Sequence, residues 1–266
     1  MKTVNEGIIL RNELLTNNPA PIYDMYILAP KMFENAGPVR PGQFVMLYTG
    51  KGEMLLPRPI SICEAFSDET VRLVYQVAGQ GTEYFSSLEE DARIGINGPL
   101  GNGFAVEGQD SPPAENRVHF LIGGGIGVPP LLSLAKEIHL RGEKAVAVLG
   151  FRDEPILIED FKEYCDAVHI ATDSGKHGFR GNAVQLLNNI LNEQAYLYAC
   201  GPRPLLKSLC EWADERGLPL QISMEERMAC GIGACVGCSV KIKSDYVAYK
   251  RVCADGPVFF GNEVVF

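Results

Sequence analysis

Four cysteines near the end of the chain have a spacing that could hold an iron–sulfur cluster. They follow the pattern C-x4-C-x2-C-x14-C and are Cys230, Cys235, Cys238 and Cys253. This spacing is that of plant-type [2Fe–2S] proteins, and thiolates are the soft ligands that such clusters require. A structural zinc site also uses four thiolates, but zinc ribbons usually supply two C-x2-C pairs, whereas here the fourth cysteine stands alone. The spacing therefore favours a [2Fe–2S] cluster over zinc.

A glycine-rich turn in the middle of the chain could cradle the pyrophosphate of a nucleotide. It lies between a predicted strand over 118–122 and a predicted helix over 130–141, where backbone amides can face a phosphate. Its glycines are Gly123, Gly124, Gly125 and Gly127. The turn lacks the G-x-G-x-x-G fingerprint, so an ordinary strand-to-helix turn is the alternative. Cys200, followed by Gly201-Pro202, ends a later predicted strand, at the sheet edge where ligands gather.

Two shorter motifs in the first third of the chain could hold a second phosphate-bearing cofactor. The first is the run Arg58, Pro59, Ile60 and Ser61, and the second is the run Gly79, Gln80, Gly81 and Thr82. An arginine can bind a pyrophosphate, a hydroxyl can hydrogen-bond a ring nitrogen, and a glycine turn entering a helix can face phosphate oxygens. A surface charge and an ordinary turn are the alternatives for each motif taken alone.

The elements around these motifs predict three domains. Residues 1–106 are rich in β-branched and aromatic runs separated by turns, which predicts an antiparallel β-barrel. Residues 117–221 alternate strands with amphipathic helices, which predicts an α/β domain with a parallel sheet. Residues 222–266 have few apolar runs and would need a metal to fold. Residues 107–116, with a Pro-Pro pair, are expected to form an exposed linker.

The boundaries of the expected elements follow from the same patterns. Strands are expected over 22–28, 43–48, 70–77, 118–122, 145–149, 167–171 and 195–200. Helices are expected over 130–141, 158–165, 182–191 and 204–216, and turns over 38–42 and 97–103.

Composition and charge exclude several classes of protein. The 266 residues include 24 Lys or Arg against 33 Asp or Glu, a net charge of −9, and no basic run, which argues against nucleic acid binding. The most apolar window, 118–135, is interrupted by glycines and prolines that an unbroken membrane helix would not tolerate. The start of the chain lacks a secretory signal pattern, so we expect a cytoplasmic protein whose eight cysteines stay reduced.

Taken together, the motifs resemble the ferredoxin–NADP reductase superfamily, in which a flavin-binding barrel precedes a pyridine-nucleotide domain. The order is R-P-x-S, G-x-G-T, G-G-G-I-G-V-P-P and C-G-P. The run over 224–238 (MEERMACGIGACVGC) and the closing run over 251–259 (RVCADGPVF) resemble the electron-transfer subunits of class 1B dihydroorotate dehydrogenases. This resemblance covers nearly the whole chain.

The resemblance implies a heterotetramer of two such chains and two FMN-containing catalytic subunits in pyrimidine biosynthesis. Electrons would pass between NAD(H), FAD, the cluster and the FMN. FAD is expected at Arg58, Pro59, Ile60, Ser61, Val74, Tyr75, Gln76, Gly81 and Thr82, with Arg58 on the pyrophosphate and Ser61 near the reactive edge of the flavin. NAD(H) is expected at Gly123, Gly124, Gly125, Gly127 and Cys200, and the cluster at Cys230, Cys235, Cys238 and Cys253. No catalytic acid or base is expected in this chain.

The chemistry of the cofactors explains why FAD would stand between NAD(H) and the cluster. NADH gives two electrons as a hydride and a [2Fe–2S] cluster takes one at a time, whereas a flavin can do both. NAD is expected over NADP, because Arg152 is followed by two carboxylates, Asp153 and Glu154, that would repel a 2′-phosphate. Met224, Met228 and Val236 could form an apolar docking patch for the catalytic subunit, or simply seal the cluster from water.

Two kinds of protein are the alternatives to a dihydroorotate dehydrogenase subunit. One is the flavin subunit of an NADH-dependent ferredoxin:NADP reductase or of a sulfide dehydrogenase, and the other is a zinc-binding scaffold.

Overall fold

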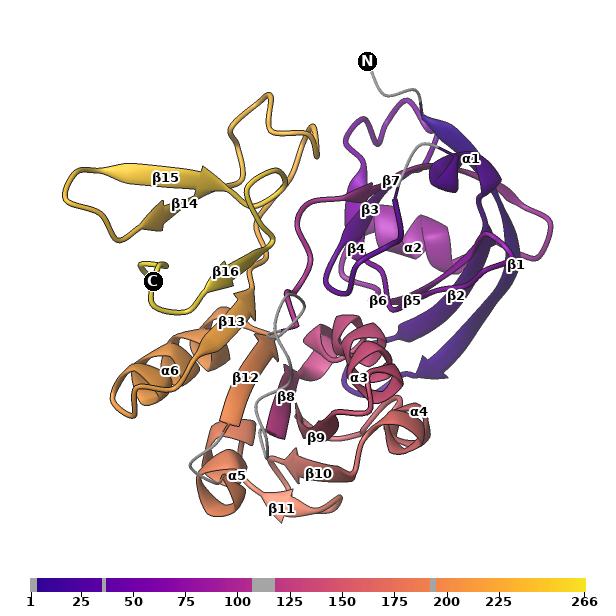
Figure 1. Cartoon of the computed structure of the whole chain (residues 1–266). Helices are drawn as coiled ribbons and strands as arrows, with labels where there is room; N and C mark the ends of the chain where they lie inside the picture. The colour runs from indigo at the N-terminus through magenta and orange to yellow at the C-terminus, as the bar shows by residue number, and fades with distance from the viewer. Residues whose placement is uncertain (1–3, 35–36, 107–117, 192–194) are drawn as a thin grey trace.

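The computed structural model describes residues 4–34, 37–106, 118–191 and 195–266, and Figure 1 shows how they are arranged. Two seven-stranded sheets and one two-stranded sheet form the framework. The first sheet lies above the second in Figure 1, and the C-terminal residues, in yellow, lie beside the first sheet. None of the helices in the described ranges is both long and apolar enough to cross a membrane.

The first sheet is antiparallel and closes on itself. Its strands are β1 (Asn5–Thr16), β2 (Ile22–Leu28), β3 (Phe44–Tyr48), β4 (Arg58–Ser61), β5 (Glu64–Ala65), β6 (Thr70–Gln76) and β7 (Arg93–Leu100), with the short helices α1 (Pro30–Phe33) and α2 (Gln80–Ser86). The strand order is β4-β3-β7-β1-β2-β6-β5, and only residues 62–63 join its two outer strands. Apolar side chains from β1, β2, β3, β6 and β7 fill the interior, and Phe85 of α2 adds to this core. The predicted barrel is confirmed.

The second sheet is built as the alternating pattern predicts. Its strands are β8 (Val118–Gly124), β9 (Lys144–Phe151), β10 (Ala167–Thr172), β11 (Phe179–Arg180), β12 (Ala195–Cys200), β13 (Leu220–Ser223) and β16 (Val258–Phe260). The connecting helices are η1 (Gly125–Gly127), α3 (Pro130–Leu140), α4 (Ile158–Tyr164), α5 (Ala183–Ile190) and α6 (Arg203–Asp214). Strands β8 to β13 pair in parallel in the order β11-β10-β9-β8-β12-β13. Helices α3 and α4 pack on one face, and α5 and α6 on the other, so the strands are apolar on both faces.

The C-terminal segment is tied to this second sheet. After β13 the chain forms the loop that holds three of the four cysteines, and then a hairpin of β14 (Ser239–Ile242) and β15 (Ala248–Arg251). Strand β16 then returns and pairs antiparallel with β13, so that Ile222 lies opposite Phe259. Val240 and Cys253 belong to the same apolar core as Leu206 and Leu209 of α6. This edge pairing was not predicted, because three residues give no periodic signal.

The expected boundaries agree with most of the observed elements. Strands β2 and β12 match the predicted ranges, and the other predicted strands and helices agree to within about two residues at each end. The predicted turn over 97–103 is wrong in its first half, because Asn97 pairs with Met46 and Leu100 with Phe44, which extends β7. The predicted linker over 107–116 lies outside the described residues.

Candidate functional site

A cavity of about 950 Å³ lies where the barrel, the glycine turn and the C-terminal segment meet. Such a volume is within the range of cofactor-binding clefts. The barrel contributes β4, the end of β6, the loop over 53–57 and residues around the start of α2, while η1 contributes Ile126. Residues 223–228 and Pro257 form the remaining wall. Three segments that are distant in the sequence therefore build one site.

Strand β4 carries the predicted flavin motif into the cavity wall. Arg58, Pro59, Ile60 and Ser61 are all half-buried and all line the cavity. Since β3 is the single partner of β4 among the described strands, the proline of β4 removes no ladder hydrogen bond that a second neighbour would need. The Arg58 guanidinium donates to the carbonyl of Leu56 and lies over Gly81. A side chain on Gly81 would overlap that guanidinium, so the glycine makes room for the arginine.

Strand β6 turns its residues alternately toward the cavity side and toward the barrel core. Val74 packs with apolar residues of the second domain, whereas the Tyr75 ring packs inside the barrel. The Tyr75 hydroxyl donates to Oδ1 of Asn12 at 3.1 Å, and burial raises the pKa of Tyr75. Val74, Tyr75 and Gln76 all border the cavity, but the Tyr75 phenol is committed to the barrel.

The turn before α2 is shaped by the hydroxyl of Thr82. This hydroxyl accepts hydrogen bonds from the amides of Ala78 at 2.9 Å and Gly79 at 3.2 Å, and it donates to the Gly79 carbonyl. Thr82 lines the cavity, while Gly81 is buried behind Arg58 and does not. The hydroxyl of Thr82 therefore has a structural role in the turn beside its predicted contact with phosphate.

The glycine turn and the turn after β12 pack directly on each other. Gly123 lies opposite Cys200 in the parallel ladder. A side chain on Gly127 would collide with the backbone of Cys200 and Gly201, which explains the glycine there. Gly125 has a φ of +54° and faces open space. The two turns thus meet at the carboxyl edge of the sheet, where nucleotides bind in such folds.

None of the residues predicted for NAD(H) lines the cavity itself, but their neighbours do. Ile126 and Ser223 form part of its wall. Cys200 is 1% exposed and lies behind Ser223, which hydrogen-bonds its side chain. Burial raises the pKa of the Cys200 thiol, followed by a contribution from the Glu225 charge, so the thiol stays protonated at neutral pH.

Two parts of the cavity wall were missed by the sequence analysis. One is the loop over 53–57, in which Leu55 is 83% exposed. The other includes Glu225, which borders the cavity with an exposed side chain, although desolvation by the neighbouring protein still raises the pKa of its carboxyl. Neither segment has a pattern of its own. The only available signal was that Glu225 lies inside the run over 224–238.

The four cysteines of the C-terminal segment lie in two pairs. Cys230 and Cys235 are within hydrogen-bond reach of each other, and so are Cys238 and Cys253. Backbone amides point at the sulfurs: Cys230 accepts from Ile232 and Cys235, both at 3.5 Å, and Cys253 accepts from Gly233 at 3.1 Å. Amides aimed at sulfur are the contacts that tune iron–sulfur clusters.

Backbone hydrogen bonds favour a thiolate at the first of these cysteines. Although burial would raise the pKa of Cys230, hydrogen bonds from Cys235, Ile232 and Ala234 lower it to about 6. Burial and the neighbouring Cys238 raise the pKa of Cys253 to about 12. The Cys253 thiol therefore needs a metal to lose its proton at neutral pH.

The pairing of the cysteines fits a two-iron cluster better than a single zinc ion. A zinc site needs four donors around one point, whereas a [2Fe–2S] cluster needs two cysteines on each of two irons. The pairs Cys230 with Cys235 and Cys238 with Cys253 meet the second requirement.

Arg251 forms hydrogen bonds that link two parts of this cysteine segment. Its guanidinium donates to both carboxylate oxygens of Asp255, at 2.9 and 3.0 Å, and to the carbonyl of Gly233 at 3.0 Å. The turn that carries Cys253 is thereby tied to the loop between Cys230 and Cys235. Sequence analysis had given Arg251 no such role.

Comparison with known proteins decides the family. The profile of the iron–sulfur cluster binding domain of dihydroorotate dehydrogenase B matches residues 225–265. The chain is 40% identical over 227 residues to the dihydroorotate dehydrogenase B (NAD(+)) electron transfer subunit of Caldanaerobacter subterraneus, covering 85% of this chain and 87% of that relative. The subunit from Streptococcus pneumoniae serotype 4 is 39% identical over 249 residues, covering 92% and 96%. The chain belongs to the family of dihydroorotate dehydrogenase B electron transfer subunits.

Solved structures agree with this membership of the electron transfer subunit family. The structure of an NADH-dependent reduced ferredoxin-NADP oxidoreductase matches with a TM-score of 0.83 at 28% identity, over all of this chain and 91% of the other. A flavohemoglobin from Malassezia yamatoensis matches with a TM-score of 0.67 at 19% identity, over 83% of this chain and 60% of the other, which shows the fold alone. The predicted family, oxidoreductase function and cofactors FAD, [2Fe–2S] and NAD(H) are thus confirmed.

Proposed function

We propose that this chain receives electrons at the cavity and delivers them through the cysteine segment to the FMN of a dihydroorotate dehydrogenase catalytic subunit. One observation carries the proposal: residues 223–228 line the cavity, and the same stretch of chain reaches the first cluster ligand, Cys230, two residues later. The loop also rests on the barrel, since a side chain on Gly231 would meet Met46 of β3. Such a short connection suits electron transfer between two cofactors.

The cavity has the donors and walls that FAD needs. Arg58 supplies a cation for the pyrophosphate, and Ser61 supplies a hydroxyl on the same strand. Val74, Ile126 and Met228 supply apolar walls. Bound FAD would accept a hydride from NADH and pass single electrons onward. Cys230, Cys235, Cys238 and Cys253 would hold the cluster.

The nucleotide preference rests on the charges after β9. Glu154 pairs with Lys176 at 2.7 Å and with His177 at 3.4 Å, and Asp153 accepts a hydrogen bond from Asn18 at 2.9 Å. The cation Lys176 is therefore already paired with a carboxylate, which a 2′-phosphate would have to displace. This supports NAD(H) over NADP(H), as the sequence predicts.

The substrate dihydroorotate is assigned to the catalytic subunit. Its oxidation needs a base and cations for the substrate carboxylate, whereas the recognised motifs of this chain are committed to FAD, NAD(H) and the cluster. Of the predicted docking residues, Val236 is 60% exposed and Met228 is half-buried, but Met224 is buried and cannot belong to a surface patch. Val236 at the cysteine loop suits a partner surface close to the cluster.

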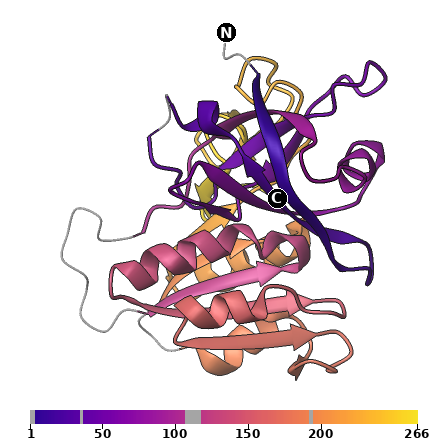
Figure 2. The same cartoon turned by 90° about the vertical axis from the view of Figure 1, so that its right-hand side faces the viewer.

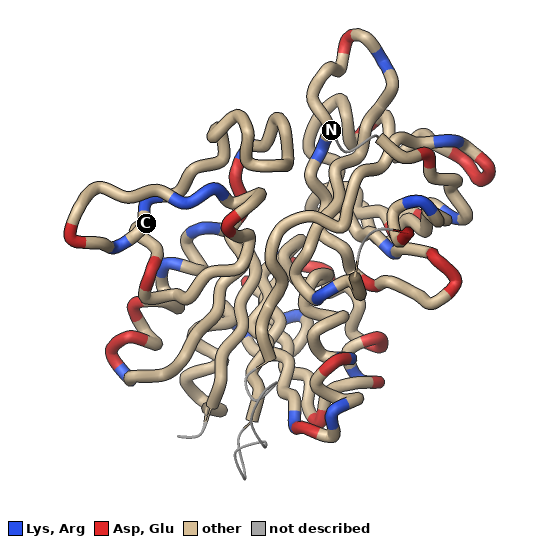
Figure 3. Tube along the Cα trace, turned by 45° about the horizontal axis from the view of Figure 1, so that its top comes forward, with Lys and Arg blue, Asp and Glu red and all other residues tan. Residues whose placement is uncertain are grey.

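Assembly and location belong to the same proposal. A heterotetramer with two copies of each subunit would place one relay beside each catalytic subunit. The cytoplasm suits this chain because all eight cysteines are free and burial raises the pKa of Cys165, Cys200 and Cys210, so their thiols stay protonated. Figure 3 shows acidic and basic residues interspersed along the described parts of the chain.

Co-purification and rapid-mixing kinetics test this function. The chain, expressed with its own cofactors, should co-purify with an FMN-containing partner. In rapid mixing, NADH should reduce its flavin faster than NADPH does at equal concentration. Faster reduction by NADPH, together with transfer to ferredoxin, would favour the related ferredoxin-NADP oxidoreductase function, which the structural likeness over the whole chain makes the second candidate.

A further inference from the structure

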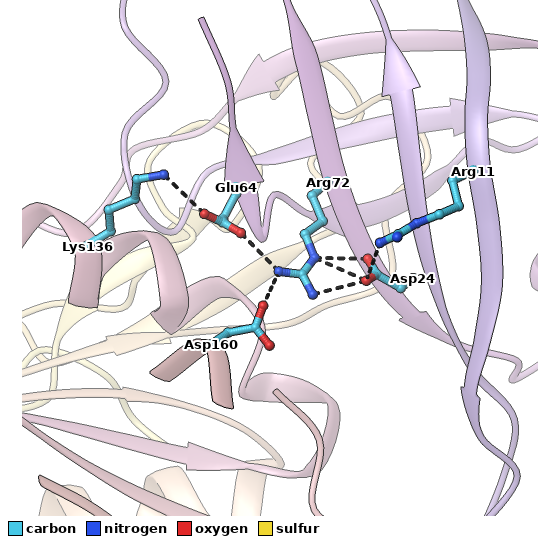
Figure 4. A network of polar contacts seen from close by, with 6 residues as sticks. All are labelled: Arg11, Asp24, Glu64, Arg72, Lys136 and Asp160. Carbon is cyan, nitrogen blue, oxygen red and sulfur yellow. Dashed lines mark hydrogen bonds and ion pairs between the residues drawn. The ribbon is translucent and has the colours of Figure 1, made fainter. Parts of the chain in front are cut away.

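A network of charged side chains joins the barrel to the second domain (Figure 4). Arg72 of β6 lies at its centre. The guanidinium donates to both oxygens of Asp24 on β2 at 3.0–3.2 Å, and to Glu64 of β5 at 3.0 Å. It also donates to Asp160 on α4, at 2.5 Å. Lys136 of α3 reaches the other oxygen of Glu64 at 3.3 Å.

The centre of this network is closed to water, and the network of six side chains as a whole is neutral in charge. The side chains of Arg72, Asp24 and Glu64 are 7%, 3% and 8% exposed. With Arg11, which contacts Asp24 at 3.4 Å, three cations face three carboxylates. Removing one partner of a buried ion pair leaves an uncompensated charge, whereas a complete set holds its geometry firmly. The network is therefore sensitive to the loss of any member.

Two contacts of the network cross from one domain to the other. Arg72 with Asp160 connects β6 to α4, and Glu64 with Lys136 connects β5 to α3. Beside them, apolar barrel residues such as Val74 pack with residues such as Leu131 of α3. In Figure 2 the barrel stands directly over these helices. The crossing contacts thus lie at the edge of an apolar interface and fix its orientation.

The elements that the network joins also carry the two predicted cofactor sites. Arg72, Val74 and Gln76 occupy alternate positions on β6 and so share one face of the strand. That face holds Asp160 at one end and borders the cavity at the other. Helix α3 begins at Pro130, three residues after the glycine turn ends at Gly127. The position of α3 and α4 against β6 therefore sets the position of the glycine turn against the cavity.

We infer that Arg72 and Asp160 are positioning residues for hydride transfer, an inference that rests on the proposed binding of FAD in the cavity and NADH at the glycine turn. In that step one hydride, a proton with two electrons, leaves NADH and joins FAD, so that NADH becomes NAD⁺ and FAD is reduced by two electrons. The rate of such a step falls steeply when the reacting groups stand even about 1 Å too far apart. Asp160 touches neither cofactor site and acts through β6.

Two neighbouring carboxylates on α4 provide a matched test in the full, cofactor-loaded chain. Asp160→Asn removes the negative charge from the crossing contact with Arg72, whereas Glu159→Gln removes the charge from an exposed pair with Lys162 inside the same helix. In rapid mixing with NADH, Asp160→Asn should lower the limiting rate of flavin reduction by about tenfold and leave the NADH dissociation constant within about twofold. Glu159→Gln should change neither, and Asp160→Glu should recover part of the rate.

Hydrogen exchange gives a readout that does not depend on turnover. Amides of α4 and β6 should exchange faster in Asp160→Asn than in Glu159→Gln, because the domains separate more often. An unchanged limiting rate in Asp160→Asn would overturn the inference, whatever the exchange data show. Should that variant fail to fold, Lys136→Gln breaks the second crossing contact at its more exposed end and must slow the same step. Failure of the unaltered chain to bind FAD or to react with NADH would instead overturn the proposed function.

Discussion

The cysteine segment and the cavity are two candidate sites of different construction. The four thiols lie between 230 and 253, and the amides that point at their sulfurs come from the same stretch. The cavity takes its walls from the barrel, from η1 and from residues 223–228. The first site is local, whereas the second depends on how two domains stand against each other. A change in one site should therefore leave the other largely intact.

The largest difference between the effects on the two sites is expected from Cys230→Ser. Serine oxygen is a poor ligand for iron, so the variant should lose its cluster while the barrel keeps FAD and the protein stays yellow. Visible absorption with iron and sulfide analysis checks this result. A full complement of iron and sulfide in the variant would show that Cys230 is not a ligand.

The converse change is Gly81→Ala, which should weaken FAD binding and spare the cluster. The new methyl group would displace the Arg58 guanidinium, and loss of a charge-assisted hydrogen bond of about 1.5–3 kcal/mol predicts about 10- to 100-fold weaker binding. Gly79→Ala is the matched control, because its φ of 175° suits any residue and a side chain there meets open space. Fluorescence titration with FAD measures both. Equal affinities in the two variants would remove Arg58 from the FAD site.

A smaller effect is expected from Arg251→Lys, which keeps the charge but loses the paired hydrogen bonds to Asp255. The turn that carries Cys253 should loosen, and a chelator should remove the cluster about three- to tenfold faster. The neighbouring change Lys250→Gln, which breaks a pair with Glu263 and a cation–π contact with Phe259 but no hydrogen bond to the loop between Cys230 and Cys235, should leave cluster loss unchanged. Similar rates of loss for both variants would contradict the role given to Arg251.

The smallest effect concerns pH and Glu225. Burial raises the pKa of this carboxyl in the folded chain. Its contribution to stability is therefore full below the pKa of the unfolded state and is lost as the pH rises through the folded value. Glu225→Gln should gain about 1–3 °C in unfolding temperature relative to the unaltered chain between pH 4 and pH 8, a small shift because the carboxyl is open to the cavity. Calorimetry measures the unfolding temperature of both proteins across this range. If Glu225 had an ordinary pKa, the two unfolding temperatures would depend on pH in the same way.

The two sites also differ in how far the sequence could predict them. Cys230 and its three partners could be predicted as ligands because a cluster constrains the spacing of nearby ligands. Arg58 and Ser61 could be predicted as binding residues because they form one short run on β4. Residues such as Leu55 and Glu225 reach the cavity through tertiary folding, so no local pattern marks them.

Contacts between residues that are far apart in the chain were even harder to predict from the sequence. Arg72 meets Asp160 across 88 positions, and β16 adds its three residues to β13 after the whole hairpin has intervened. Strand β1, which runs over Asn5–Thr16, was also absent from the expected strands, because its burial does not alternate regularly. Periodicity predicts elements, whereas the pairing of distant side chains is decided by packing.

The central claim, that this chain is an electron relay and that dihydroorotate reacts elsewhere, is tested most directly by one assay. Purified, cofactor-loaded chain is mixed with dihydroorotate and NAD⁺, with and without the FMN-containing catalytic subunit, and formation of NADH is followed. The account predicts no NADH from the chain alone, although it reduces dyes with added NADH, and turnover once the partner is present. Turnover by the isolated, FMN-free chain would contradict it.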